Sequence, residues 1–240
     1  MVHTGRKPAK SKTDLSEMIL LAVDTSGKYG SIALARTQED ANADDILDVI
    51  PLEGGTFSAQ LVPQIAALLS KHGLSKRDIG AFAVASGPGS FTGLRVGLAA
   101  VKGLAEILGK PIAAVSRLEA VARSGRSRGA VTAVLDAGRN EIYVGEYNVT
   151  ERAQLIRERL LSREEFLSNP GTATIVTPER SLAEAARVAG FKVEEVPYTT
   201  SDAIARLGWE RIKQGITISP EDLEANYIRR SDAEIFAKKI

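Results

Sequence analysis

The sequence predicts an α/β protein built from two related halves, each with a mixed β-sheet. Met18–Asp24 is a continuous apolar run that ends in an acid, as expected of a strand buried on both faces. A turn and a second strand at Gly30–Arg36 follow at once, so these two strands are antiparallel. Ala130–Ala137 and Ile142–Val149 repeat this order of strand, acid, turn and strand, which indicates a duplicated architecture.

The composition is that of an ordinary globular protein. Of its 240 residues 44% are hydrophobic, enough for a core that needs no disulfide or metal. The chain has no cysteine, which excludes disulfides and thiolate chemistry and fits a cytoplasmic location. No apolar run approaches the roughly 20 residues of a membrane span. With 31 basic and 30 acidic residues the basic surplus of a nucleic-acid-binding protein is missing, so we expect any RNA contact to be local or shared with a partner.

The first 17 residues differ from the rest in being polar and basic. They have no hydrophobic segment of the kind found in secretory signals. We therefore predict that residues 1–17 are a disordered, solvated arm.

The first half, residues 18–115, continues with helices and buried strands. A helix is predicted at Ser58–His72, capped by Ser58, with Pro63 causing a kink or a later start. A second helix is predicted at Thr92–Leu108, closed by Gly109. The predicted strands are Asp44–Leu52, Ile79–Ser86 and Ile112–Val115.

The second half, residues 116–240, opens with a helix at Arg117–Arg123 and a loop with three arginines. That loop and the pair Arg229–Arg230 lack interleaved aromatics, so we interpret both as solvated. Beyond the repeated strands we predict helices at Ser162–Leu167, Pro178–Ala189 and Ser201–Lys213, strands at Thr174–Val176 and Lys192–Val196, and an irregular tail.

The strongest local motif is the loop GPGSFTG, Gly87–Gly93, between a strand and a helix. A helix N-terminus preceded by glycines can hold a phosphate. The loop lacks the Gly-Lys-Ser/Thr ending of a Walker loop and is no GxGxxG, so we interpret it as a structural turn.

Two acids occupy equivalent places at strand ends, Asp24 and Asp136. Each could hold a metal-bound water, but a single Asp at such a place more often caps a turn. The only histidines, His3 and His72, form no i, i+4 pair, which argues against a metalloprotease site and against a Ser/His/Asp triad. We predict no catalytic, cofactor-binding or metal site.

The Thr92–Leu108 helix is apolar or small over about 220° of its circumference, against the roughly 100° of an ordinary surface helix. One flank fits the helix's own sheet. The other is a groove of small residues without an obvious partner in the first half. Burial within the same chain or a subunit interface could cover it, and we predict the interface. The predicted interface residues are Gly93, Gly97, Ala100 and Leu104, together with Leu61, Ile65 and Leu68 of the preceding helix.

The run AFAVASGPGSFTGLRVGLAAVKGLAEILGKPIAAVSRLEAVA, Ala81–Ala122, resembles the signature region of the TsaB (YeaZ) family. One departure from the family is Phe57, which stands before Ser58 where many members have His. The other matching segments, in family order and covering nearly the whole chain beyond the arm, are Met18–Ser26, Ser58–Leu69, Val134–Tyr147 and Asn226–Arg230.

The resemblance implies an actin/hexokinase-like (ASKHA) fold and a non-catalytic role in making threonylcarbamoyladenosine on tRNA. The implied partner is a TsaD-like catalytic subunit, which transfers the threonylcarbamoyl group to adenosine 37 of tRNA and is bound through the N-terminal half. A TsaE-like ATPase would join the complex, the isolated chain would form a homodimer, and tRNA would be contacted only indirectly. The paired histidines of the TsaD metal site have no counterpart here.

Two other functions remain open from the residues. An actin-fold ATP-binding kinase or hydrolase would place Asp24 and Asp136 around Mg²⁺. Against it, Gly138, the one glycine in the second turn, is followed by the bulky Arg139. A protease acting on a TsaD-like partner, in line with the name glycoprotease-like (M22) family, has almost no residue support, and fold alone does not carry function.

Overall fold

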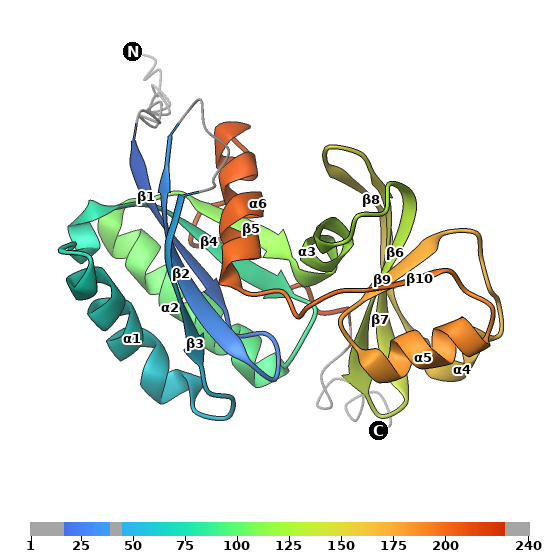
Figure 1. Cartoon of the computed structure of the whole chain (residues 1–240). Coiled ribbons are helices and arrows are strands. Elements are labelled where there is room, and N and C mark those ends of the chain that lie inside the picture. The colour runs from blue at the N-terminus through green and yellow to red at the C-terminus, as the bar shows by residue number, and fades with distance from the viewer. Residues whose placement is uncertain (1–16, 39–44, 229–240) are drawn as a thin grey trace, which may run out of the picture.

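The first of two sheets contains strands β1 (Met18–Asp24), β2 (Gly30–Thr37), β3 (Asp45–Leu52), β4 (Ile79–Gly87) and β5 (Ile112–Ser116). The computed structural model describes residues 17–38 and 45–228, so the predicted arm lies almost wholly outside the described residues (Figure 1). The strand order is β3-β2-β1-β4-β5. β1 pairs antiparallel with β2 and parallel with β4, which makes the sheet mixed.

The second sheet contains β6 (Gly129–Gly138), β7 (Glu141–Val149), β8 (Ala153–Ser162), β9 (Thr174–Thr177) and β10 (Val193–Glu195). Its order, β10-β9-β6-β7-β8, is that of the first sheet written in the opposite direction. β6 pairs antiparallel with β7 and parallel with β9, as β1 does with β2 and β4. The predicted duplication is therefore confirmed strand by strand.

Helices cover both faces of the first sheet (Figure 1). α1 (Phe57–Lys71) and α2 (Phe91–Leu108) lie on one face, and α6 (Ser201–Lys213) packs on β1, β2, β4 and β5 from the other side. α6 follows the second sheet in sequence, yet its neighbours are strands of the first. Within residues 17–38 and 45–228, no helix is long and apolar enough to cross a bilayer.

The two faces of the first sheet differ in side-chain size. The face toward α1 and α2 carries branched residues of β1 and β2: Leu21, Val23, Ile32 and Leu34. The face toward α6 is dominated by alanines: Ala22, Ala33, Ala35, Ala81, Ala83, Ala85 and Ala113. These short side chains let α6 approach closely, since a Cβ on Gly208 would lie 2.4 Å from the Cβ of Ala83.

The second sheet carries shorter helices. α3 (Arg117–Ser124) lies between the sheets and packs on β6 and β7, with Leu118 and Val121 fully buried. α4 (Arg163–Leu167) and α5 (Arg180–Val188) cover the other face, where Phe166 stacks on Phe191.

Two local predictions are wrong. α1 begins at Phe57 after Thr56, not after a Ser58 cap, because Phe57 is a core residue that belongs to the buried face of the helix. The helix runs through Pro63 without a later start. β8 was not predicted, because its sequence AQLIRERLLS shows no clean alternation and most of the strand is partly or fully exposed.

A polar cluster around Glu158 of β8 joins the two halves. Its carboxylate accepts hydrogen bonds from the Ser116 hydroxyl at 2.5 Å and from the Tyr147 hydroxyl at 2.6 Å. Burial, followed by the neighbouring Glu158 charge, raises the pKa of Tyr147, so this phenol stays a donor. The Asn226 side chain also donates to Glu158, at 2.6 Å, and its backbone N–H donates to the Ser86 carbonyl at 2.7 Å. β5, β7, β8 and the C-terminal segment thus meet at one carboxylate.

Candidate functional site

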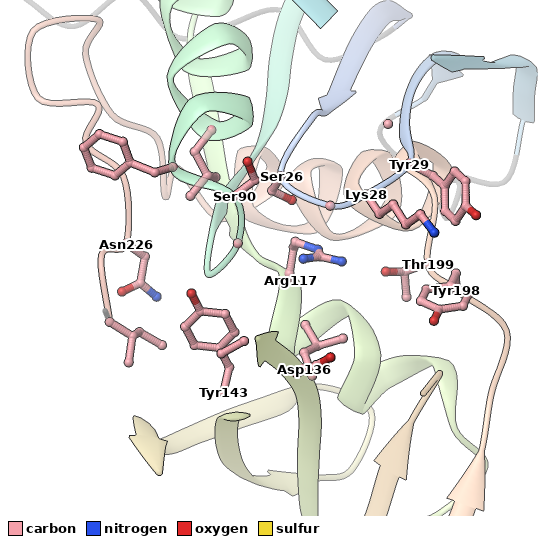
Figure 2. A pocket seen from close by; sticks show the side chains of 18 of the residues that line it. Ser26, Lys28, Tyr29, Ser90, Arg117, Asp136, Tyr143, Tyr198, Thr199 and Asn226 are labelled. Carbon is pink, nitrogen blue, oxygen red and sulfur yellow. The ribbon is translucent and has the colours of Figure 1, made fainter. Parts of the chain in front are cut away.

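A cleft of about 870 Å³ opens between the two sheets (Figure 2). The first half contributes the β1–β2 turn and the loop before α2, and Arg117 lies between the halves at the start of α3. The second half contributes the end of β6 with the turn that follows it, Tyr143 and Tyr198. The C-terminal segment closes one side with residues 226–228. Both strand-end acids identified in the sequence lie at this cleft.

Asp24 is buried beneath the cleft, at 4% exposure. Its Oδ1 accepts hydrogen bonds from the backbone N–H of Ser26, at 2.9 Å, and from the Ser26 hydroxyl. The Nε of Arg117 lies 3.9 Å from the other carboxylate oxygen, and the Arg117 guanidinium also donates to the Pro88 carbonyl at 3.3 Å. The negative charge of Asp24 is therefore matched by a protein cation. A metal ion at the same carboxylate would be repelled by that guanidinium.

Asp136 makes the equivalent turn contact but is exposed. Its Oδ1 accepts a hydrogen bond from the backbone N–H of Gly138 at 2.8 Å, two residues on, as Asp24 does from Ser26. Arg139 and Asn140 take positive φ angles of 54° and 63°, the geometry of a tight hairpin turn. The interpretation of both acids as turn-capping residues is confirmed.

The glycine loop is packed against the β1–β2 turn. The N–H of Ser90 donates to the Ser26 carbonyl at 2.7 Å, and a Cβ on Gly89 would lie 2.2 Å from that same oxygen. The Ser90 hydroxyl caps α2 by accepting from the Gly93 N–H at 3.3 Å. Glycine is needed at position 89 because two backbones touch there, as a structural turn requires.

The predicted interface residues lie deeper than expected. Leu61, Ile65 and Leu68 are core residues at 1%, 4% and 0% exposure. Gly93 and Gly97 are also buried, and a Cβ on them would lie 2.0 Å and 2.4 Å from atoms of Thr25. The expectation that this glycine flank has no partner in the first half is wrong, because Thr25 fills it.

Ala100 and Leu104, on the same helix, are half-buried and pack against the core. They border the exposed side of α2. The interface itself stays a prediction, and what another chain could reach is the outer surface of the two helices rather than the buried stripe.

Among the described residues, the other charged candidates singled out in the sequence do not lie at the cleft. The three arginines interpreted as a solvated loop are Arg123, Arg126 and Arg128. Arg123 lies in α3 instead and forms a two-point ion pair with Glu210 of α6, with N–O distances of 3.1 and 3.0 Å. His72 contacts Asp48 of β3 at 3.2 Å. Over residues 17–38 and 45–228 no group of three or more His, Asp or Glu side chains is arranged to hold a metal ion. Arg229 and Arg230 lie outside the described residues.

Sequence reasoning missed the most prominent side chains of the cleft. Arg117 directly follows β5, and the carboxyl ends of parallel strands meet at one edge, a signal that could have placed it near Asp24. Tyr29, Tyr198 and Tyr227 come from segments far apart in the chain, and no local pattern links them.

Comparisons with known proteins identify relatives of this chain. A family model described as "TsaD: tRNA N6-adenosine threonylcarbamoyltransferase" matches residues 51–235. A Bacillus subtilis protein named "tRNA threonylcarbamoyladenosine biosynthesis protein TsaB" is 38% identical over 131 residues, covering 54% of this chain and 55% of that protein. The Escherichia coli protein of the same name is 29% identical over 230 residues, covering 90% of this chain and 96% of that protein. The Bacillus match thus spans about half of each protein, and the Escherichia match nearly all.

The solved structure "YeaZ from Pseudomonas aeruginosa" superposes with a TM-score of 0.71 at 24% identity, covering 88% of this chain and 99% of that one. This likeness concerns the fold. The two duplicated mixed sheets with helices on their faces form the actin/hexokinase-like fold that the sequence resemblance implied.

Proposed function

The chain belongs to the family of the TsaD model and within it to the TsaB (YeaZ) proteins of tRNA threonylcarbamoyladenosine biosynthesis, and from this premise we propose that it is a non-catalytic accessory subunit. In this proposal it binds a TsaD-like catalytic subunit in the cytoplasm and enables that subunit to transfer threonylcarbamoyl to adenosine 37 of tRNA. A TsaE-like ATPase joins the complex, and the isolated chain pairs with a second copy through the same surface.

The observation that carries the accessory role is the outer surface of α1 and α2. Val62 of α1 and Ile107 of α2 are 58% and 77% exposed. Ala66, Ala99 and Gly103 on these helices are exposed too and carry little or no side chain. Small and apolar residues exposed on two neighbouring helices suit close packing against a helix of another chain.

The chemistry around Asp24 supports a role without catalysis. A kinase or hydrolase would use this carboxylate to hold Mg²⁺ or its water. Here Ser26 satisfies one oxygen and Arg117 supplies the opposing charge.

The test is a co-purification experiment with the TsaD-like protein of the same organism. Ile107→Glu places a charge on the proposed interface and is expected to weaken the complex by at least about tenfold. Val188→Glu is the matched control, because Val188 is also an exposed aliphatic residue, at 90%, but lies on α5 of the other half. Both variants are expected to stay folded, since neither side chain is buried.

The same variants are then compared in a reconstituted tRNA modification assay. We expect the wild type and Val188→Glu to support modification and Ile107→Glu to fail although no residue of the cleft has changed. Modification by the TsaD-like protein without this chain, or unchanged binding of Ile107→Glu, would refute the proposal. Titration calorimetry with ATP and Mg²⁺ tests the kinase alternative, which predicts binding that Asp24→Ala abolishes.

A further inference from the structure

Tyrosine is concentrated at the cleft. The chain has five tyrosines, and four of them line it: Tyr29, Tyr143, Tyr198 and Tyr227. Tyr29, Tyr198 and Tyr227 are 66%, 51% and 44% exposed, so their rings face solvent rather than the core. Leaving large rings in water gives no folding advantage. Several at one cleft indicate a surface that a ligand covers.

The cleft is also locally basic, although the chain as a whole is nearly neutral. Its lining includes four cationic side chains, Lys28, Arg95, Arg117 and Arg139, against two carboxylates, Asp136 and Glu179. Two of the cations lie beside aromatic rings: the Lys28 ammonium is 5.4 Å from the centre of the Tyr29 ring, and the Arg95 guanidinium is 3.7 Å from that of Phe91. Aromatic faces interleaved with cations are the pattern used to bind single-stranded nucleic acid.

The aromatic residues lie at two ends of the cleft with a cation between them. In Figure 2, Tyr29 and Tyr198 lie at one end, Tyr143 lies near Asn226 at the other, and Arg117 is between the two. Tyr227 also belongs to the second end, where its ring lies 5.0 Å from that of Phe91. Arg117 lines the cleft between the two ends, with its Nε turned toward the Asp24 carboxylate at 3.9 Å. It supplies a cation midway between the aromatic ends.

Tyr198 is held in position by the second half. Its hydroxyl donates to a Glu179 carboxylate oxygen at 2.7 Å, which fixes one edge of the ring while half of the side chain stays exposed. That hydrogen bond raises the pKa of Tyr198 to about 12, so the phenol stays neutral near an anionic ligand. A fixed, neutral ring is well suited to stack on a base.

We infer that this cleft binds an unpaired segment of RNA, with one base stacked at the Tyr29–Tyr198 end, the next on the exposed ring of Tyr227 at the other end, and the connecting phosphate near Arg117 and Lys28. Tyr143, at 6% exposure, forms the floor of the second end rather than a stacking surface. The inference rests on the proposed function, which makes tRNA the RNA in question, and it departs from the expectation that this chain contacts tRNA only indirectly. The cleft volume of about 870 Å³ lies in the upper part of the range of about 300–1,000 Å³ for ligand sites and admits a short unpaired segment. A free mononucleotide would occupy only one of the two ends.

The experiment measures the binding of a fluorescent, unstructured RNA of about ten nucleotides to the full chain at low salt by anisotropy. Tyr29→Ala and Tyr198→Ala are each expected to weaken binding by about tenfold, since each removes a stacking ring. Tyr29→Phe keeps the ring and is expected to bind within about twofold of the wild type. Lys28→Glu is expected to weaken binding most at low salt. Lys76→Glu is its matched control, because Lys76 is an exposed lysine just before β4, away from the cleft.

Three results would overturn the inference. The first is that the chain binds no RNA even at high concentration, and the second is that the cleft variants bind as the wild type does. The third is that AMP or ATP binds as tightly as the oligonucleotide and displaces it, which would make the ligand a free nucleotide. Because the assay contains no TsaD-like partner, its failure is distinct from failure of the proposed function, which the Ile107→Glu co-purification tests separately.

Discussion

Replacing Gly97 of α2 with alanine tests how closely the helix packs on β1. A Cβ at this position would lie 2.4 Å from the Oγ1 of Thr25, a distance that real Cβ atoms do not show. The same hydroxyl donates a buried hydrogen bond of 2.7 Å to the Gly93 carbonyl. Thr25 must therefore move, and its movement breaks this bond.

The size of the effect follows from three contributions. Overpacking a well-filled core by one methyl group costs about 1–3 kcal/mol. Loss of the Thr25 hydrogen bond adds about 0.5–1.5 kcal/mol. Against these costs, alanine in place of a helical glycine stabilises the folded state by about 0.5–1 kcal/mol. The net destabilisation is roughly 0.5–4 kcal/mol, which for a chain of this length lowers the melting temperature by roughly 1–16 °C.

Gly103 is the matched control, since it lies on the same helix but an added Cβ there meets nothing within 4 Å. Gly103→Ala is expected to gain only the helix-propensity contribution and to raise the melting temperature by roughly 1–4 °C. Thermal unfolding followed by circular dichroism measures both variants.

A double mutant identifies the cause. In a Thr25→Ala background the Oγ1 is gone, and the next atom that the new Cβ of Gly97→Ala would meet is a Val23 methyl at the ordinary contact distance of 3.5 Å. The second substitution is then expected to be neutral or stabilising, a coupling of at least about 1 kcal/mol. If Gly97→Ala melts at or above the wild-type temperature, or costs the same with and without Thr25, the packing argument is refuted.

Three further predictions concern the fold. The Lys71 ammonium and the His72 ring hold the pKa of Asp48 below its usual value of 3.8, so the stability from this contact is present above that pH and lost as pH falls through the lower folded pKa. Asp48→Asn is therefore expected to destabilise the protein by about 1 kcal/mol or less at neutral pH, seen as a slightly lower melting temperature, and to have no effect below about pH 3. The same difference in melting temperature between variant and wild type in acid would contradict this. Glu158→Gln replaces an acceptor of three hydrogen bonds by an amide whose N–H₂ faces donors, so urea unfolding should show a loss of about 1–3 kcal/mol, and a smaller loss would mean that solvent replaces the cluster. Phe57→Ala should cost about 3–5 kcal/mol because the ring packs on Gly30 and is 7% exposed, whereas a cost below about 1 kcal/mol would show that the site collapses.

The sequence alone was enough to predict most helices and strands and to recognise the family. β1, β4 and β6 are apolar runs that end at turn residues, and a strand buried on both faces leaves just that pattern. The bounds of α6 were predicted to the residue, because an apolar stripe and polar flanks mark both ends. The repeat of strand, acid, turn and strand correctly indicated two halves of one design. It also indicated that both acids cap turns, since an Asp two residues before a free N–H closes the turn by a local contact.

The tertiary structure decided what depends on contacts between distant segments. A wide apolar arc on α2 indicates that much of the helix is covered but not by what, and only the structure places Thr25 against Gly97 and leaves Ile107 exposed. β8 could not be predicted from the sequence, because the residues of an exposed strand need not alternate between polar and apolar. It is a strand because it pairs with β7. α6 returns to the first sheet because the alanines of that face leave room for it, as where Gly208 meets Ala83, 125 positions away in the sequence. The cleft follows from the same fact, since Arg117 and the four tyrosines share no local pattern and meet only where the two sheets face each other.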